Sequence, residues 1–378
     1  MEGLDPSKVV VAMSGGVDSS VAALLLKRAG YQVVGVTMRL FSIDEKTLPP
    51  YYKGCCTIDD VEDARRVCET LDIPHYVFNV QREFQSYVID YFLAEYQRGN
   101  TPHPCIACND RIKFSFLLQR AHFLGATYVA TGHYARIKME VDGYHLLKGA
   151  DQSKDQSYVL YGMGQTELAH TLMPVGWHPK EEIRELAREA GFVNADKPDS
   201  QEICFIPLGD YREFLKDRIT PKAGRLVDSE GKVLGEHRGI EFYTVGQRRG
   251  LGFTSATPLY VTSIDAESGD ITVGPEEDLL RKALWASQVS YVSGLEPSQG
   301  AEVSVKIRYK STETPAILYP QGDEALIRFA DPQRAITPGQ AVVFYQGEEV
   351  LGGGRIAQKP EGPMAEPHAG AAKVNAIP

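Results

Sequence analysis

The sequence has few cysteines and lacks the long apolar runs and leader segments of secreted or membrane proteins. Its 378 residues include 6 cysteines, too few for a disulfide-stapled scaffold, and thiols stay reduced by default in a reducing compartment. The opening MEGLDPSKVV lacks the basic start and apolar stretch of a signal peptide. No apolar run approaches the roughly 20 residues that span a membrane. We therefore expect a cytoplasmic protein with no membrane partner, in which any important cysteine acts chemically.

A global excess of basic residues is also missing. The chain carries 40 Lys and Arg against 50 Asp and Glu, a formal net charge of -10. Proteins that bind nucleic acid usually show a basic surface, because contacts with phosphate dominate affinity. If RNA is a substrate, the positive surface must be local. Hydrophobic content of 43% and charged content of 24% exclude a disordered or fibrous chain.

The first half of the chain alternates strand and helix patterns. Buried-strand runs occupy 8–13, 31–40, 74–80 and 126–134, and helical patterns follow at 17–28, 57–73, 83–98 and 110–124. Val17, Val21, Leu24 and Leu25 share one helix face, and Thr57 is the expected N-cap of its helix. This alternation predicts an α/β fold, a doubly wound parallel sheet that binds ligands beyond the carboxyl ends of its strands. The irregular connection 41–56 is longer than usual and is expected to be a mobile loop.

The residue pattern changes after about residue 210, where short runs of alternating apolar and polar residues, broken by glycine, predict hairpins. Period-two alternation over 283–357 suggests a compact β-barrel. Because single cores stop growing at roughly 250–300 residues, two or three domains are expected. We predict an α/β domain over 1–209, a β-rich middle domain over 210–282, the barrel over 283–357 and a disordered tail over 358–378.

The segment SGGVDSS, residues 14–20, lies between a strand and a helix. Gly15 and Gly16 let the backbone turn tightly and point its N–H groups at an anion, and the helix N-terminus adds a favourable dipole. The segment lacks the Gly-x-x-x-x-Gly-Lys-Ser/Thr pattern and its lysine, which disfavours a γ-phosphate-transferring enzyme. The bland alternative is an ordinary glycine-rich turn.

SGGVDSS resembles the pyrophosphatase loop of the ATP pyrophosphatase superfamily, whose members cleave ATP between its α and β phosphates. The resemblance implies ATP and Mg2+ as cofactors, with no metal site of the protein's own. It also implies these nucleotide contacts: Ala12, Met13, Ser14, Gly15, Gly16, Val17, Asp18, Ser19, Met38 and Gly132.

Two cysteine motifs narrow the resemblance to one family. NTPHPCIACNDRIKF (100–114) and DSQEICFIP (199–207), with GHYAR, KDQSYVL, YTVGQRRGLG and KIRY in order, are similar to the bacterial-type tRNA-specific 2-thiouridylases. The resemblance implies replacement of the C2 oxygen of the wobble uridine, position 34, by sulfur, with release of AMP and pyrophosphate. It makes Cys108 the nucleophile and Cys204 the persulfide carrier, joined in a transient Cys108–Cys204 disulfide. The implied partners are tRNA (Lys, Glu and Gln isoacceptors) and a sulfur donor, either a cysteine desulfurase or a sulfur relay protein.

The chemistry of the residues agrees with this resemblance. A thiocarbonyl requires a sulfur carrier and a means of breaking the C2–O bond, for which adenylation is suited. Thiolates are the reactive form, and helix N-termini favour them; Cys108 is expected just before the helix at 110–124, with Asn109 as its cap. Cys204 is expected on a loop. Direct attack by the persulfide sulfur and prior release of sulfide both remain open.

The remaining cysteines carry weaker predictions. Cys68 falls on the inward face of a helix and is expected in the core. Cys55 and Cys56 have no assigned role. A zinc site made of these two with Cys105 and Cys108 has the right ligand count, but adjacent cysteines are an awkward ligand spacing. Cys105 stands where some relatives carry Asp, and a thiol is a poorer general acid or base at neutral pH.

The resemblance also places RNA contacts. The target base is expected at His103, Pro104 and Cys105, and other tRNA contacts are implied for His133, Lys154, Asp155, Gln156, Arg308, Tyr309 and Gln340. Arg308 beside Tyr309 offers phosphate pairing and a stacking face, while Arg248 and Arg249 add charge to the middle domain. Each residue alone is more simply a solvated surface group. Two rival functions remain: an adenylating ligase or synthetase for a small molecule, and a noncatalytic RNA-binding or sulfur-carrier protein.

Overall fold

The computed structural model describes residues 5–41, 58–199, 203–206, 209–253 and 255–358. The expectations for Thr57, Cys55, Cys56, the connection after residue 41 and the tail therefore fall on residues outside the described ones. None of the described helices is long and apolar enough to cross a membrane.

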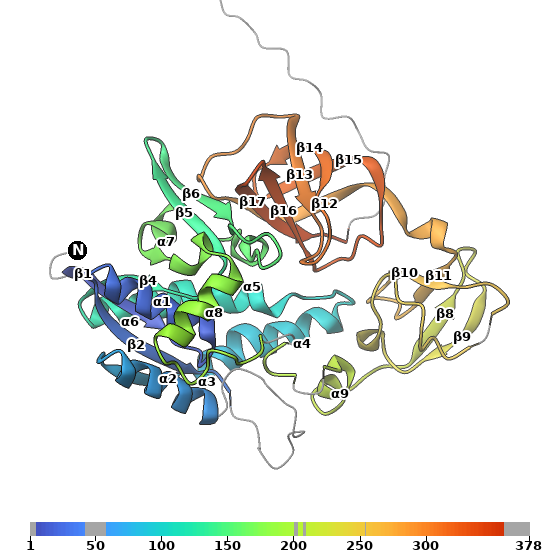
Figure 1. Cartoon of the computed structure of the whole chain (residues 1–378). Coiled ribbons are helices and arrows are strands. Elements are labelled where there is room, and N and C mark those ends of the chain that lie inside the picture. Colours follow the sequence, from blue (N-terminus) through green and yellow to red (C-terminus); the bar gives the residue numbers. More distant parts are fainter. Residues whose placement is uncertain (1–4, 42–57, 200–202, 207–208, 254, 359–378) are drawn as a thin grey trace, which may run out of the picture.

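The N-terminal part is built on a five-stranded sheet in the order β3-β2-β1-β4-β7. Figure 1 labels three of its strands, β1, β2 and β4. All four strand pairs are parallel, which confirms the predicted sheet. The order reverses between β1 and β4, the switch point where such sheets bind ligands. The strands are β1 (Asp5–Ala12), β2 (Gln32–Arg39), β3 (His75–Asn79), β4 (Ala126–Ala130) and β7 (Thr171–Leu172).

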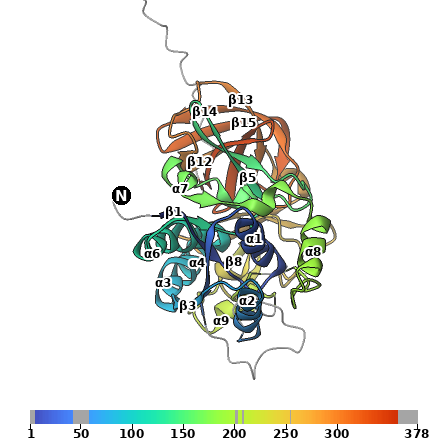
Figure 2. The same ribbon diagram turned by 60° about the vertical axis from the view of Figure 1, so that its left-hand side comes forward.

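Helices cover both faces of this sheet. On one face α1 (Val17–Arg28), α2 (Ile58–Thr70) and α8 (Lys180–Glu189) pack in one apolar cluster with β1. On the other face α6 (Leu117–Phe123) packs against β1, β2 and β4. Figure 2 shows α6 and α1 on opposite sides of the strands. Leu26, not Leu25, completes the fully buried side of α1.

The helix that carries Cys108 starts earlier than predicted. It runs through α5 (Pro104–Cys108), the π-helix η3 (Asn109–Phe116) and α6, with His103 as N-cap. Pro104 begins it because the fixed φ of proline suits the first helical position and its missing N–H would be unpaired there anyway. Cys108 therefore lies inside the helix. Asn109 is not a cap: it is buried, and its Nδ2 donates to the Val159 carbonyl at 2.9 Å.

The strand predicted at 126–134 is also shorter, since β4 ends at Ala130. The chain then crosses the N-terminus of α1, and a Cβ on Gly132 would lie 2.6 Å from the Ser19 nitrogen. Only glycine fits this close approach. Beyond it, β5 (Ala135–Glu140) and β6 (Gly143–Lys148) form a hairpin that was not predicted.

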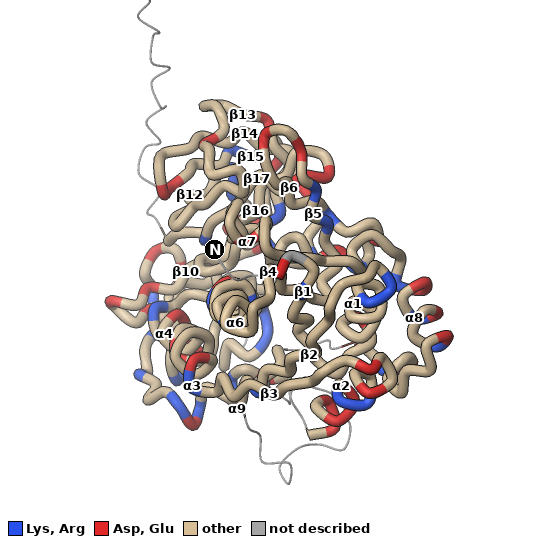
Figure 3. The backbone as a smooth tube through the Cα atoms, turned by 90° about the vertical axis from the view of Figure 1, so that its left-hand side faces the viewer, with Lys and Arg blue, Asp and Glu red and all other residues tan. Residues whose placement is uncertain are grey.

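Short helices fill the connections of this part of the chain. The structure contains α3 (Gln81–Phe84), η2 (Gln85–Ile89), α4 (Asp90–Gln97), η4 (Ser157–Leu160), α7 (Gln165–Ala169), η5 (Pro174–Trp177) and α9 (Tyr211–Lys216). Acidic and basic residues are interspersed along α2 and α8 (Figure 3).

The middle part is a four-stranded sheet in the order β10-β11-β8-β9. Its strands are β8 (Gly224–Val227), β9 (Val233–His237), β10 (Tyr260–Ile264) and β11 (Ile271–Gly274), with η6 (Ile240–Phe242) between the two hairpins. A small core that includes Leu226, Val261 and Ile271 holds it together.

The C-terminal part is the predicted β-barrel, preceded by η7 (Glu276–Leu279). Six strands pair in the order β12-β15-β14-β13-β16-β17, and β12 pairs with β17 to close the ring. They are β12 (Leu280–Tyr291), β13 (Ala301–Lys306), β14 (Thr314–Gln321), β15 (Glu324–Arg334), β16 (Ala341–Gln346) and β17 (Glu349–Ile356). The β5–β6 hairpin joins β17 through the pair Glu349 and Leu147, which ties the barrel to the N-terminal part.

Candidate active site

A cavity of about 270 Å³ lies at the carboxyl ends of β1, β2 and β4, where the order of the sheet reverses. We call it the nucleotide cavity. Of the residues expected to contact a nucleotide, it is lined by Ala12, Met13, Ser14, Asp18, Ser19, Met38 and Gly132. The fold thus brings together segments from three strands that are far apart in the chain.

The loop between β1 and α1 is closed on itself by its serines. The Ser14 N–H donates to Ser19 Oγ at 3.2 Å, and the hydroxyls of Ser19 and Ser20 each donate to the Gly16 carbonyl at 3.0 Å. Gly15 has φ 73°, which disfavours any other L-residue. A Cβ there would lie 2.3 Å from the Asp60 carbonyl oxygen. The backbone of α2 therefore abuts the loop and fixes where its N–H groups point.

A second hollow of about 450 Å³, the polar cavity, shares Ser14, Asp18, Asp60 and Gln156 with the first. Lysines and carboxylates alternate around it. Ion pairs join Lys180 to Asp18 (2.7 Å) and Asp199 (2.8 Å), Lys154 to Asp199 (2.9 Å), and Lys197 to Asp60 and Asp63 (2.7 Å each). The ring places three lysines beside the glycine loop, where the phosphate oxygens of a bound anion can replace their carboxylate partners.

Sequence reasoning missed Lys180, Lys197, Asp60 and Asp199. Burial alone would raise the pKa of Asp199, but hydrogen bonds from Lys180 and Lys154 lower this pKa to about 2. The carboxylate is therefore charged at neutral pH. Asp199 opens the DSQEICFIP motif, which is a signal that could have singled it out. Lys180 and Lys197 belong to no sequence motif. Only the packing of α8 and of the segment after it brings them to the cavity.

The two cysteines of the sequence motifs meet at one apolar cluster. Cys108 is 7% exposed within it, and Cys204, half-buried in a turn as expected, packs against it. Phe205 anchors that turn, because its ring centroid lies 5.7 Å from that of Phe84 and 5.4 Å from that of Phe92. We call this group the cysteine cluster. The fold thus brings residues 96 positions apart in sequence onto a shared surface.

The cysteine cluster also touches the nucleotide cavity. Leu40 lines the cavity and belongs to the cluster, and Met38 lines the cavity and packs against the cluster. Both residues lie at the carboxyl end of β2, Met38 within the strand and Leu40 directly after it. The nucleotide cavity and the cysteine cluster therefore share Leu40 and Met38 as an apolar wall.

Cys68 is 1% exposed in the core, as predicted, and burial raises the pKa of its thiol to about 12. It is unsuited to nucleophilic chemistry, because the thiolate is the reactive form. The zinc hypothesis depends on Cys55 and Cys56, which fall outside the described residues. Cys105 is exposed, on the first turn of α5.

The residues expected at the target base lie beside an aromatic group. The ring of His103 lies 5.9 Å from Tyr158 and 6.3 Å from Tyr309, centroid to centroid. Burial lowers the pKa of His103 to about 4, so its imidazole is neutral at pH 7. Gln340 holds the segment just before His103 in place, since its Nε2 donates to the Thr101 carbonyl at 2.8 Å.

Of four other expected tRNA contacts, His133, Lys154 and Gln156 line the cavities and Asp155 lines neither. His133 is buried in the nucleotide cavity, and its Nδ1 shares a hydrogen bond with Thr131 Oγ1 at 2.8 Å. Asp155 accepts from the backbone N–H groups of Gly149 and Ser157, which is a turn-holding role. Lys154 and Gln156 line the polar cavity.

Arg308 is partly committed to the barrel, where its Nη2 donates to the carbonyls of Arg334 and Ala335. Burial, and then the charge of Arg334, lower the pKa of Arg308. Tyr309 lines the polar cavity. Arg248 lines a separate surface hollow of the middle part, so the structure does not bring it to either cavity.

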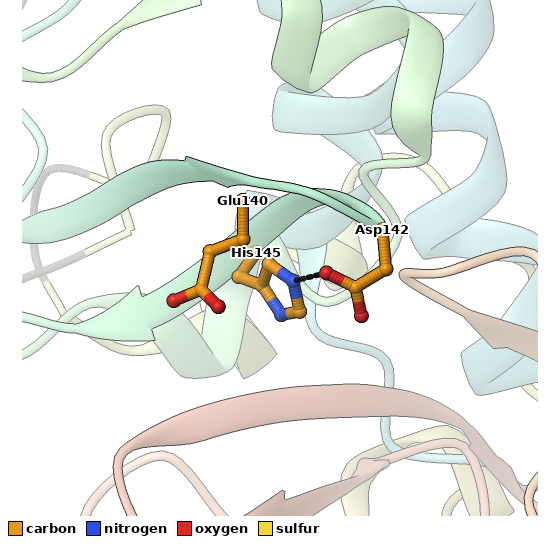
Figure 4. Close-up of side chains that lie close together, drawn as sticks. All are labelled: Glu140, Asp142 and His145. Carbon is orange, nitrogen blue, oxygen red and sulfur yellow. Dashed lines mark hydrogen bonds and ion pairs between the residues drawn. The ribbon is translucent and has the colours of Figure 1, made fainter.

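Among the described residues, one group of side chains has metal-ligand spacing: Glu140, Asp142 and His145 on the β5–β6 hairpin (Figure 4). Both nitrogens of His145 are already engaged, Nδ1 with Glu349 of β17 at 2.6 Å and Nε2 with Asp142 at 3.0 Å. Glu140 pairs with Lys138 at 2.6 Å. The group therefore serves as a contact between hairpin and barrel.

This contact predicts a pH-dependent stability. Hydrogen bonds to Glu349 and then Asp142 raise the pKa of His145, so its stabilising effect is full below the unfolded value of about 6.5 and is lost as pH rises through the folded value. We expect His145→Gln to lower Tm by about 1–3 °C at pH 6 and by less at pH 9. The control is His170→Gln, because His170 makes no ion pair with a carboxylate among the described residues: its Nδ1 engages the Thr166 carbonyl and its ring packs edge-on against His122. A pH-independent difference for His145→Gln contradicts the assignment.

Family models match three successive segments of the chain. They are the tRNA methyl transferase HUP domain over 7–208, the tRNA methyl transferase PRC-barrel domain over 212–275 and the aminomethyltransferase beta-barrel domain over 281–356. Among solved structures, a 4-thiouridine synthetase in an RNA complex with bound ATP matches with 21% identity and a TM-score of 0.33, over 56% of this chain and 50% of that chain.

Relatives match nearly the whole chain. The tRNA-specific 2-thiouridylase MnmA of Moorella thermoacetica is 51% identical over 92% of this chain and 98% of its own length. The MnmA of Carboxydothermus hydrogenoformans is 49% identical over 95% of this chain and 100% of its own. With this identity over this coverage, the chain belongs to the family of tRNA-specific 2-thiouridylases.

Proposed function

We propose that this protein is an ATP-dependent tRNA-uridine 2-sulfurtransferase that thiolates the wobble uridine. The observation that carries the proposal is the shared wall of Leu40 and Met38 between the nucleotide cavity and the cysteine cluster. An adenylated base formed in the cavity would lie next to the thiols that must attack it. Neither a plain nucleotide-binding protein nor a sulfur carrier needs both features side by side.

The glycine loop and the polar cavity would hold the phosphates of ATP. The N–H groups at the start of α1 suit an anion. Lys154, Lys180 and Lys197, now paired with carboxylates, would bind the phosphate oxygens in their place. Mg2+, when bound, supplies further positive charge to the phosphates. Asp18 and Asp60, which line both cavities, would hold it, because this cation prefers oxygen ligands.

The first step is activation of the base. The C2 carbonyl oxygen of the uridine attacks the α-phosphorus of ATP, the bond from that phosphorus to its bridging oxygen breaks, and the electron pair leaves with pyrophosphate. The oxygen on C2 then carries AMP, a far better leaving group than an oxide.

Sulfur transfer follows through the two cysteines. The terminal sulfur of a Cys204 persulfide attacks C2, and the C2–O bond breaks with its electron pair leaving on AMP. The Cys108 thiolate attacks Cys204 Sγ, the bond to the transferred sulfur breaks, and the pair left on that sulfur forms the thiocarbonyl. If Cys108 attacks first, the sulfur leaves as hydrosulfide and then attacks C2, with the same products. Both orders end in a Cys108–Cys204 disulfide, which an external thiol reduces before a donor protein reloads Cys204.

The base would enter beside His103, Pro104 and Cys105, where the half-buried Tyr309 offers an aromatic face for stacking. Tyr158 is 0% exposed and packs beside the His103 ring from within the core. Arg308, Gln340 and the Lys154–Gln156 segment flank this entrance and are the proposed tRNA contacts, with His133 reaching from the cavity side. The expected substrates are the Lys, Glu and Gln isoacceptors. The sulfur donor is a cysteine desulfurase or relay protein, and the reaction takes place in the cytoplasm, where tRNA is modified.

Turnover of ATP tests this proposal against a small-molecule ligase. Purified protein should release pyrophosphate and AMP in equal amounts only when tRNA with uridine at the wobble position is present. A tRNA with cytidine there is the matched control and should give no release above background. Alkylation of the protein's thiols should abolish product formation. Pyrophosphate release without tRNA, retained after alkylation, would favour the ligase.

A further inference from the structure

Lys113 is a charged residue of the nucleotide cavity that no sequence motif assigned to a ligand. It lines the cavity together with Met38, Gly132 and His133. Its neighbours Ile112 and Phe114 are 0% and 1% exposed, so packing fixes the helix backbone on both sides of it. Lys113 therefore stands at a defined place on the cavity wall.

Lys113 is also the cavity's source of unshared positive charge. Of the described residues that line the nucleotide cavity, it is the only Lys or Arg. The lysines of the polar cavity that flank Asp18 and Asp60 are neutralised by carboxylates. No ion pair or hydrogen bond joins the Lys113 ammonium to another residue within the described ranges. Since no described carboxylate neutralises Lys113, an anion in this cavity can pair with it directly.

The buried His133 responds to this charge. Burial, and then the positive charge of Lys113, hold the pKa of His133 well below 6.5. The neutral imidazole engages Thr131 through Nδ1, and it cannot balance a negative ligand. The side of the cavity formed by Gly132 and His133 thus relies on Lys113 for cationic character.

The winding of η3 relates Lys113 to Cys108. In an α-helix of about 3.6 residues per turn, a residue five positions on lies roughly 140° around the axis. A π-helix closes its hydrogen bonds between residues five apart, as the Leu117 N–H does with the Ile112 carbonyl, and this brings such residues close to one face. Cys108 is the last residue before η3, and Lys113 lies five positions further on, within η3. The π-helix therefore turns the lysine and the cysteine toward neighbouring parts of the site.

We propose that Lys113 is a further catalytic residue, whose ammonium group binds the α-phosphate of the nucleotide and stabilises its negative charge as AMP leaves the uridine. This role rests on the proposed function. The ammonium ion remains protonated throughout. When the C2–O bond breaks, the electron pair that moves onto the phosphate oxygen of AMP is balanced by the fixed charge of Lys113.

Binding of AMP and adenosine tests this contact without any turnover. Lys113→Met, which keeps the length of the side chain, should weaken AMP binding about 10-fold to 100-fold and leave adenosine binding unchanged, because adenosine has no phosphate. Lys113→Arg should restore most of the AMP affinity. Arg111→Met is the control: it removes a cation from the same helix at an exposed position and should leave both affinities at the wild-type level. Equal weakening of AMP and adenosine, or none, overturns the proposal.

Single-turnover thiolation then separates this proposal from the broader one. With all ligands saturating, Lys113→Met should slow sulfur transfer about 100-fold or more, and Arg111→Met should not. If the wild-type protein never thiolates tRNA, the proposed function is refuted. If Lys113→Met nevertheless loses affinity for AMP and keeps its affinity for adenosine, the phosphate contact is supported. Thiolation by Lys113→Met at the wild-type rate overturns the catalytic role of Lys113.

Discussion

Replacing Cys204 by serine is expected to lower 2-thiouridine formation by at least about 1000-fold, and replacing Cys108 by serine should do the same, because removal of a covalent nucleophile typically costs this much. The physical reason is the shared position of the two thiols at the cysteine cluster beside the nucleotide cavity. Serine keeps the shape of either side chain, but it cannot carry or release a sulfane sulfur. The measurement is the rate of thiolation with ATP, tRNA and a persulfide donor.

The two variants should differ in what accumulates. Cys204→Ser cannot be loaded, so its intact mass stays unchanged after treatment with the donor. Cys108→Ser can be loaded, and a mass increase of one sulfur atom should persist on the peptide that contains Cys204. Cys68→Ala is the control: Cys68 is buried in the core, so this change should reduce stability and leave the rate per folded molecule unaltered. Substantial turnover by Cys204→Ser with the donor present contradicts the carrier role.

Gly15→Ala is expected to weaken ATP binding by about 100-fold or more. The added Cβ would lie 2.3 Å from the Asp60 carbonyl oxygen, so either the loop or α2 must shift. The φ of 73° adds about 1–2 kcal/mol of backbone strain. N–H groups displaced from the phosphates would each lose a charge-assisted hydrogen bond of about 1.5–3 kcal/mol. Equilibrium binding of a nonhydrolysable ATP analogue measures the effect.

Gly30→Ala provides a matched control. Gly30 also has positive φ, at 89°, but a Cβ there meets nothing within 4 Å. Both substitutions should therefore lower the free energy of unfolding through backbone strain, and only Gly15→Ala should lower nucleotide affinity. Equal affinities for the two variants would show that the contact between the loop and α2 does not position the phosphate-binding groups.

Periodicity in the sequence was sufficient to predict the main layers of the fold. The parallel sheet follows from short apolar runs such as 8–13 that are buried on both faces, and the barrel follows from period-two alternation after residue 283. Packing decided the rest. Pro104 begins the helix that was expected to start at 110, and Gly132 ends a strand early because the chain passes over Ser19. Neither effect is visible in hydrophobic periodicity.

The candidate site divides in the same way. The glycine loop could be predicted as an anion site, since its residues and its place between a strand and a helix suit one. The predicted pairing of Cys108 with Cys204 depends on family resemblance alone, because a separation of 96 positions carries no geometric information. Lys180, Lys197 and Asp199 were missed because their partners come from other elements, and Lys113 was missed because its orientation depends on the π-helical winding of η3.

The most direct test of the central claim is nucleoside analysis of tRNA from a strain depleted of this protein and complemented with wild type or Cys204→Ser. We expect 2-thiouridine derivatives to disappear from tRNA on depletion, to return with the wild-type chain and to remain absent with Cys204→Ser. Unchanged 2-thiouridine levels after depletion, or full restoration by Cys204→Ser, would contradict the assignment of this chain to wobble-uridine thiolation through a Cys204 persulfide.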